Sequence, residues 1–166
     1  MTSRNIIIVF ITAVLMASVA FADKVDPRVR TYIDPVRVVW QSKSTQGYGT
    51  RMQVARTERL LEKHYGQVPE YGVGTRPSAC YLQNKGEIPS VLLDFGRELH
   101  GGVQIGTGWD SLGMRLRVRF GESVAEAMSD IGEKGATNDH AMRDNVVGAP
   151  PLGTIEIGNS GFRFVR

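Results

Sequence analysis

The sequence predicts a mainly β protein, an antiparallel β-sandwich or jelly roll with one short helix. Residues 114–120 alternate strictly, with apolar side chains on one face and Arg115, Arg117 and Arg119 on the other. Such alternation is typical of a strand with one face in the core and one in solvent. Other short β-like runs follow at regular spacing between glycines, which favours an antiparallel sheet over a parallel one.

The first 22 residues have the pattern of a secretory signal peptide. Arg4 precedes an apolar run over residues 6–19, and the small residues Ala20 and Ala22 stand just after that run. The run is shorter than the roughly 20 apolar residues that a membrane-spanning helix needs. We therefore expect cleavage after Ala22, a secreted or periplasmic protein, and a mature chain that does not contact the membrane.

One domain is expected in the mature chain. Residues 23–50 contain a proline-punctuated lead-in, a first strand at residues 36–40 and a linker rich in Ser, Thr, Gln and Gly. The sandwich is expected over residues 51–166, a common size for a single domain. Its last alternating run reaches Arg166, so we expect the domain to be truncated at the C-terminus, with more protein following.

Within the sandwich, residues 51–64 carry a partial apolar stripe with helical spacing and are expected to form the only helix. A turn is expected from Asp94 to Gly102 and another at residues 158–162, because both segments are rich in glycine. Further strands are expected at residues 79–83, 90–95, 102–105, 114–120, 152–157 and 162–165.

Charge and cysteine content narrow the functional classes. The formal net charge is +3 and falls to +2 when Arg4 is removed, and the basic residues are interleaved with acidic ones. Because the sequence has no cluster of basic residues, we do not expect a nucleic-acid partner. Cys80, the single cysteine, lies in an apolar run, so it is expected to be a buried small hydrophobe rather than a nucleophile.

The candidate carbohydrate-binding residues come from three places in the sequence. Asp94, Arg97 and Glu98 belong to the turn at residues 94–102, and Glu122 follows the run at residues 114–120. Asn138, Asp139, His140 and Arg143 belong to the most polar loop, residues 132–145. Carboxylates, amides and arginines can bind vicinal hydroxyl groups of sugars. Oxygen-rich loops also bind calcium, for which Asn138 and Asp139 are candidate ligands, and a solvated loop is the third interpretation.

Glycoside hydrolysis requires two carboxylates that lie roughly 5 to 9.5 Å apart. Glu98 and Glu122 are the obvious candidates in the sequence. However, carboxylates at the rim of a sandwich are commonly solvated or cap turns, so no catalytic residue is assigned.

Four segments of the chain resemble the N-terminal region of bacterial α-L-rhamnosidases. Their order and spacing also match, and the resemblance spans about residues 35–166. The segments are residues 93–102 (LDFGRELHGG), 119–123 (RFGES), 132–140 (GEKGATNDH) and 156–166 (EIGNSGFRFVR).

This resemblance implies an accessory β-sandwich that precedes an (α/α) barrel. In that family the barrel supplies the acidic residues that hydrolyse terminal rhamnose with inversion, and it is absent from this sequence. The chain is then a non-catalytic fragment that needs no cofactor, is inactive alone, and has the barrel and a rhamnose-containing carbohydrate as partners. Some related modules bind rhamnose through calcium, so calcium assistance remains open.

Two other interpretations stay open beside the accessory fragment. One is an independent carbohydrate-binding module, with or without calcium. The other is an exported interaction domain that has no sugar ligand.

Overall fold

The computed structural model describes residues 30–43, 52–63, 80–84, 86–108, 111–133 and 143–166. The chain divides into two compact units, Met1–Thr31 and Tyr32–Arg166, and every helix and strand described belongs to the second. The expected signal peptide lies outside the described residues. Among the residues that are described, no helix has the length and apolar character needed to cross a membrane.

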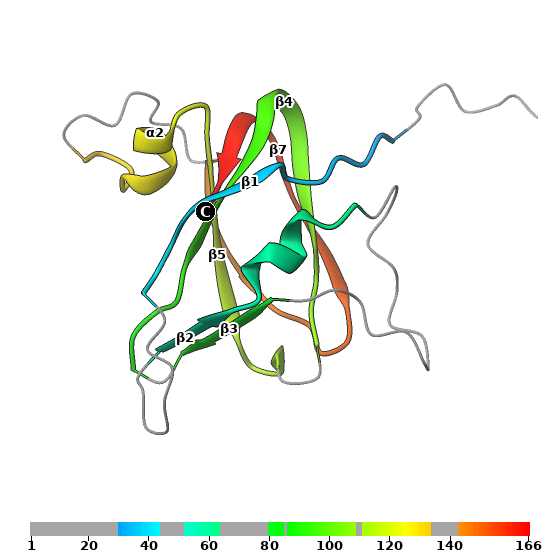
Figure 1. Cartoon of the computed structure of the whole chain (residues 1–166), viewed down its shortest axis with the longest axis vertical. Coiled ribbons are helices and arrows are strands. Elements are labelled where there is room, and N and C mark those ends of the chain that lie inside the picture. Colours follow the sequence, from blue (N-terminus) through cyan, green and yellow to red (C-terminus); the bar gives the residue numbers. More distant parts are fainter. Residues whose placement is uncertain (1–29, 44–51, 64–79, 85, 109–110, 134–142) are drawn as a thin grey trace, which may run out of the picture. The chain divides into compact units, whose positions relative to one another are not determined.

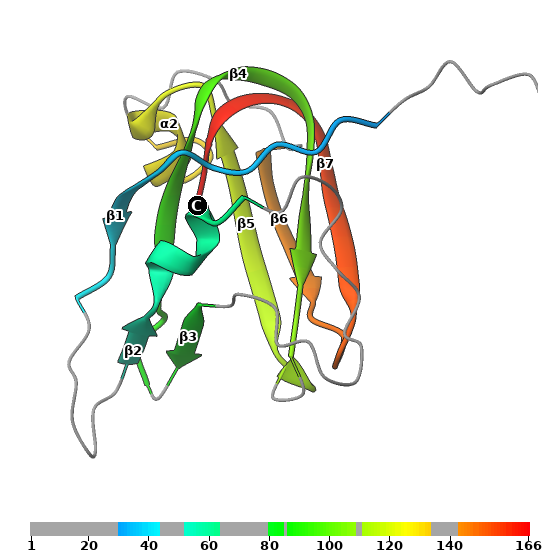
Figure 2. The same ribbon diagram turned by 45° about the vertical axis from the view of Figure 1, so that its right-hand side comes forward.

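A five-stranded antiparallel sheet forms the main part of the second unit (Figure 1). Two of its strands are much longer than the others, and Figure 2 shows these two, β4 and β7, bending together over one end of the sheet. The sheet therefore curls on itself and can enclose a core. The strands stand in the spatial order β1 (Arg37–Gln41), β4 (Val91–Gly106), β7 (Thr154–Val165), β5 (Arg115–Gly121) and β6 (Asp144–Gly148).

A small second sheet and two helical segments accompany the main sheet. Strand β2 (Met52–Ala55) pairs antiparallel with β3 (Tyr81–Asn84). The 3₁₀ helix η1 (Thr57–Leu61) follows β2 after one residue, and the α-helix α2 (Val124–Met128) follows β5.

A bulge accompanies the bend of the long strands. The pairing of β4 with β7 advances from Asp94 to Leu99 on β4, but only from Phe164 to Phe162 on β7. The extra residues of β4 bulge out of the ladder, and Gly96 among them has φ +79°, which glycine adopts readily. Bulges of this kind bend a strand and increase its twist.

A second irregularity brings two glycines together. Gly102 of β4 lies opposite Gly158 of β7, whose φ is +135°. A Cβ on Gly102 would lie 2.5 Å from the carbonyl oxygen of Ile157, and one on Gly158 would lie 2.4 Å from the Gly102 Cα. Only glycine therefore fits at either position without moving the backbone.

The concave side of the sheet holds an aromatic core. The Phe162 ring packs against Phe95, with centroids 5.5 Å apart and an edge-on geometry, and against Phe120, with centroids 5.0 Å apart. Val118, Ile157 and Val165 complete this buried cluster. The opposite side is covered locally by α2, where Leu92 and Phe164 pack with Ala127.

The mainly β, antiparallel fold predicted from the sequence is confirmed, but several elements differ from the prediction. Residues 51–64 contain β2 and η1 in place of an α-helix, and the α-helix is α2, which the prediction missed. The two predicted turns, at residues 94–102 and 158–162, lie inside β4 and β7. Their glycines permit bulges and a close backbone approach within long strands, so they do not end those strands.

Candidate functional site

Asp94, a predicted sugar contact, is a buried structural carboxylate. Its side chain is 2% exposed and receives two hydrogen bonds from Arg163, from Nε to Oδ1 at 2.9 Å and from Nη2 to Oδ2 at 3.1 Å. Arg37 donates to Oδ2 at 2.8 Å, and the Gly96 amide donates to Oδ1 at 2.7 Å. These bonds, those from Arg163 above all, lower the pKa of Asp94 to about 2. Asp94 therefore joins β1, β4 and β7, and its two carboxylate oxygens already accept hydrogen bonds from within the protein.

Arg143 is also buried, with 1% of its surface exposed. Its Nη1 donates to the carbonyl oxygens of Glu126, at 2.9 Å, and Ser129, at 3.2 Å, at the end of α2. A cation that donates to the last carbonyls of a helix stabilises that end. Arg143 is thus a helix-anchoring residue whose guanidinium lies in the interior of the protein.

The start of α2 is capped by its own sequence. The Ser123 Oγ accepts a hydrogen bond from the Glu126 amide at 3.2 Å, and the Glu126 carboxylate accepts one from the Glu122 amide at 2.8 Å. This arrangement is a variant of the capping box. The spacing Ser-x-x-Glu was the signal in the sequence that could have located this helix.

The other described candidates are exposed and lie around the bend of β4. Arg97, Glu98 and Glu122 are all exposed. The Glu98 charge contributes to raising the pKa of Arg163, after the larger effect of Asp94, so Glu98 lies near that guanidinium.

Strand pairing adds a residue that was not among the sequence candidates. His100 pairs with Gly161, and a Cβ on Gly161 would lie 3.3 Å from the Glu122 Oε1. Paired residues present their side chains on the same face. The exposed His100 and the Glu122 carboxylate therefore share a face, which only the register reveals. The bend surface is defined here as Arg97, Glu98, His100 and Glu122.

The remaining predicted residues, Asn138, Asp139 and His140, lie outside the described part of the chain, so the two calcium candidates among them do too. Within the described ranges, no group of three or more His, Cys, Asp or Glu side chains is placed to hold a metal ion. Asp94 and Asp144 there are already hydrogen-bonded to arginines.

A network of arginines and carboxylates lies on the outer face of β5. Arg117 donates to both carboxylate oxygens of Asp144, at 2.8 and 2.6 Å, and Arg119 donates to Asp144 at 3.0 Å. Arg119 also donates to the carboxylate of Asp130 and to the Met128 carbonyl. The hydrogen bond from Arg117 is the largest influence that lowers the pKa of Asp144. Arg119 is only 4% exposed, so the prediction that the arginine face of this strand is solvated is wrong at this position.

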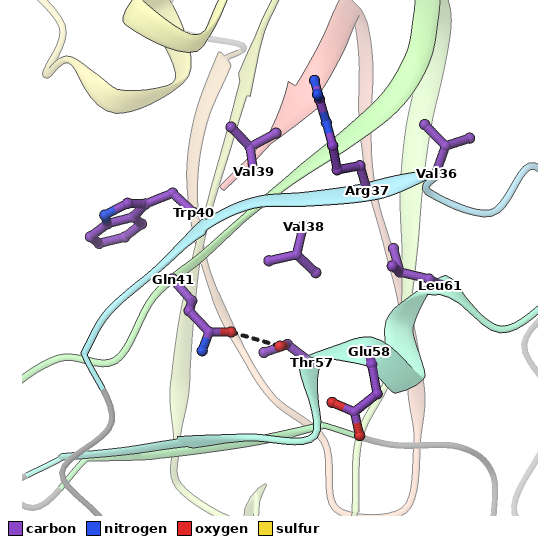
Figure 3. Close-up of a pocket in the computed structure, with 9 residues that line it drawn as sticks. All are labelled: Val36, Arg37, Val38, Val39, Trp40, Gln41, Thr57, Glu58 and Leu61. Atoms are coloured by element: carbon purple, nitrogen blue, oxygen red, sulfur yellow. Dashed lines mark hydrogen bonds between the residues drawn. The ribbon is translucent and has the colours of Figure 1, made fainter.

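A shallow, open groove of about 540 Å³ lies between β1 and η1 (Figure 3). Its lining residues precede those of the bend surface in the sequence, and the sequence analysis did not predict a site there. Val38 and Leu61 contribute aliphatic surface, and Gln41, Thr57 and Glu58 contribute polar groups. Thr57 Oγ1 donates to Gln41 Oε1 at 2.6 Å.

Cys80 precedes β3 and is partly buried. Burial is the main cause that raises the pKa of its thiol, and the negative charge of Glu58 adds to this effect. A thiol with a raised pKa stays protonated at neutral pH and is a poor nucleophile. This agrees with the interpretation of Cys80 as a small packed side chain.

Neither models of protein families, nor curated proteins, nor solved structures gave a match to this chain. Two exposed regions of the described chain, the bend surface and the groove between β1 and η1, are the candidate sites. The bend surface offers acceptors, a guanidinium and an imidazole, and the groove combines aliphatic and polar groups. Both regions are open to solvent.

Proposed function

We propose that this chain is the exported, non-catalytic accessory domain of an α-L-rhamnosidase-like glycoside hydrolase that acts on rhamnose-containing glycans. The observation that carries the proposal is the meeting of three of the four rhamnosidase-like segments on adjoining strands. Residues 93–102 lie on β4, residues 119–123 include the end of β5, and residues 156–166 include most of β7. Their exposed polar residues form the bend surface at one end of the sheet.

The chemistry of the described carboxylates favours binding over hydrolysis. Asp94 and Asp144 are hydrogen-bonded to arginines that lower their pKa, so they are poor proton donors. Glu98 and Glu122 lie on open surface. Catalysis would then come from a separate domain, and this domain would contact the glycan or that catalytic domain.

An independent carbohydrate-binding module is the second candidate. The polar groups on the bend surface favour it, because His, Arg and Glu side chains can donate to and accept from vicinal hydroxyls without another domain.

Two measurements on the purified chain test the proposal. Incubation with an aryl α-L-rhamnoside should give no hydrolysis. Calorimetric titration with L-rhamnose, with and without calcium, should show whether the chain alone binds the sugar, which the second candidate requires. Turnover that disappears in Glu98→Gln or Glu122→Gln would overturn the non-catalytic assignment.

Matched variants locate the binding. Arg97→Ala and Glu122→Gln should weaken binding of a rhamnosyl glycan if the bend surface contacts it. Arg115→Ala and Glu87→Gln are the controls, since both side chains are exposed and lie outside the bend surface. Equal affinity in all four variants would remove the bend surface from the proposal.

A further inference from the structure

Within the described part of the chain, the main sheet has two edge strands, β1 and β6, and only β1 is protected. β1 has a bulge between Val38 and Trp40, carries the exposed cation Arg37, and faces η1 across the groove. Bulges, charges and covering elements keep further strands from an edge. β6 is paired without interruption over Asp144–Gly148, and no described element other than β5 makes extensive contact with it. The outer edge of β6 can therefore accept another strand.

The backbone groups at this edge alternate along β6. Ala149 donates its amide proton to the Met114 carbonyl oxygen at 3.0 Å, one step beyond the β5–β6 ladder. In an antiparallel ladder every second residue exchanges hydrogen bonds with the same neighbour, so Val147 also bonds to β5. The residues in between direct their N–H and C=O groups to the outer edge, and these are Asp144, Val146 and Gly148.

The three outward-facing residues are arranged symmetrically about Val146. A second copy of β6 that runs antiparallel and is centred on Val146 places this residue opposite its own counterpart, and Asp144 opposite Gly148. Val146 is 50% exposed, and its side chain shares the outer face of the sheet with that of its pairing partner Arg117. In this arrangement the two valines cover each other, and the outward N–H and C=O groups gain partners.

The charges on the outer face are compatible with this pairing. Asp144 is the charged residue of β6, and it falls opposite Gly148 of the second copy, so two carboxylates do not meet. Gly148 pairs with the exposed Arg115 of β5. Arg115 of one copy therefore stands in the same row as Asp144 of the other, with a glycine between them, and opposite charges attract across a row. A Cβ on Gly148 would meet no atom within 4 Å, so this space is open.

We infer that the chain forms a two-fold symmetric homodimer by antiparallel pairing of β6 with β6 of a second copy, centred on Val146. Such pairing joins the two main sheets edge to edge, and it is closed because the same strand is used by both copies. One short strand from each copy makes a small interface, so the Kd should lie between about 1 μM and 1 mM. The inference does not depend on the proposed function.

Disulfide cross-linking of the whole purified chain tests the register. The background is Cys80→Ala, because Cys80 is the single cysteine. Val146→Cys should give a disulfide-linked dimer under mild oxidation, since Cα atoms of a hydrogen-bonded pair lie about 5.5 Å apart. Gly148→Cys is the matched control, because its two copies would lie about 13 Å apart along the strands. Absence of the cross-link in Val146→Cys, or an equal cross-link in Gly148→Cys, overturns the inference.

Analytical ultracentrifugation tests the dimer without a covalent bond. The mass of the unsubstituted chain should rise with concentration toward that of two copies. Val146→Asp brings two like charges together on the symmetry axis and should weaken dimerisation at least about tenfold. Ile88→Asp is the control, since Ile88 is apolar, 81% exposed and outside β6, and it should dimerise normally.

Circular dichroism should show that both aspartate variants are folded. If Val146→Asp does not fold, Gly148→Asp replaces it, because this change fits the open space in the single chain but places a second carboxylate against Asp144 of the other copy. A chain that stays monomeric up to about 1 mM overturns the homodimer. Dimerisation that Val146→Asp leaves unchanged, or that Ile88→Asp weakens equally, overturns the assignment to the β6 edge.

Discussion

The two faces of β5 bury their side chains by different means. On the concave face, Val118 and Phe120 are 4% and 0% exposed and pack in the aromatic core. On the other face, Arg119 is 4% exposed, yet it is surrounded by Asp144, Asp130 and the Met128 carbonyl. The first face is stabilised by removal of apolar surface from water, whereas the second must supply a partner for each buried charge.

This difference implies unequal tolerance to substitution. Truncating a buried apolar side chain lowers stability in proportion to the atoms and packing contacts removed. Removing one member of a buried ion pair lowers stability because the other charge stays buried without a partner. Substitutions on the two faces should therefore differ in how much unfolding free energy they cost and in how that cost depends on pH.

The largest effect is expected from Phe120→Ala, at about 3–5 kcal/mol of unfolding free energy, because it removes a fully buried ring from the core. Chemical denaturation should measure the loss. Met114→Ala is the control, since Met114 is 46% exposed and should change stability by less than about 0.5 kcal/mol. Similar losses in the two variants would contradict the assignment of the concave face as the core.

Arg119→Ala should be the next most damaging, at about 1–3 kcal/mol, because Asp144 and the Met128 carbonyl lose a buried donor. Arg117 still pairs with Asp144, so the loss should stay below that of Phe120→Ala. Arg119→Met, which keeps the apolar part of the side chain, separates lost packing from lost charge. Full stability in both variants would show that the network contributes nothing.

Acid should weaken the ion pairs of two buried carboxylates, Asp144 opposite the outer face of β5 and Asp94 on β4. The pKa of Asp144 is lowered chiefly by the hydrogen bond from Arg117, and that of Asp94 is lowered to about 2. Because both folded-state pKa values lie below the unfolded value of about 3.9, this stabilisation is complete above that pH. It is lost as the pH falls through the folded-state values. Unfolding free energy measured between pH 6 and pH 2 should fall below about pH 4, and less steeply in Asp94→Asn.

The smallest effect is expected from Arg117→Ala, at about 0.2–1 kcal/mol, because its side chain is 53% exposed and solvent screens its ion pairs. Thermal unfolding at low and high salt should show a slight loss that shrinks as salt is added. A loss as large as that of Arg119→Ala would mean that exposure does not distinguish the two arginines.

Alternation along residues 114–120 was enough to predict which side chains share a face of β5, and the prediction for Val118 and Phe120 is confirmed. It could not predict what covers the opposite face. The cover of Arg119 comes from α2 and β6, which follow later in the chain, and α2 has only five residues. A helix this short has too few positions to show a periodicity, so only its caps could be recognised.

The candidate site was predicted less completely than the fold. Polar character drew attention to Asp94 and Arg143, but their arginine and carbonyl partners lie far away in sequence. The groove between β1 and η1 forms where two segments separated in the sequence pack together, and no local sequence pattern predicts it. Single-sequence patterns report local geometry, whereas the satisfaction of a buried charge is a property of the whole fold.

The meeting of Gly102 and Gly158 has a consequence for how this sequence can vary. In each case the obstacle to a side chain is backbone, the Ile157 carbonyl oxygen or the Gly102 Cα, and no choice of rotamer moves it. A substitution at one position therefore cannot be compensated by a smaller residue at the other, since both are already the smallest. In a saturation-mutagenesis library selected for folding, these two positions should keep glycine independently of each other and of the rest of the sequence.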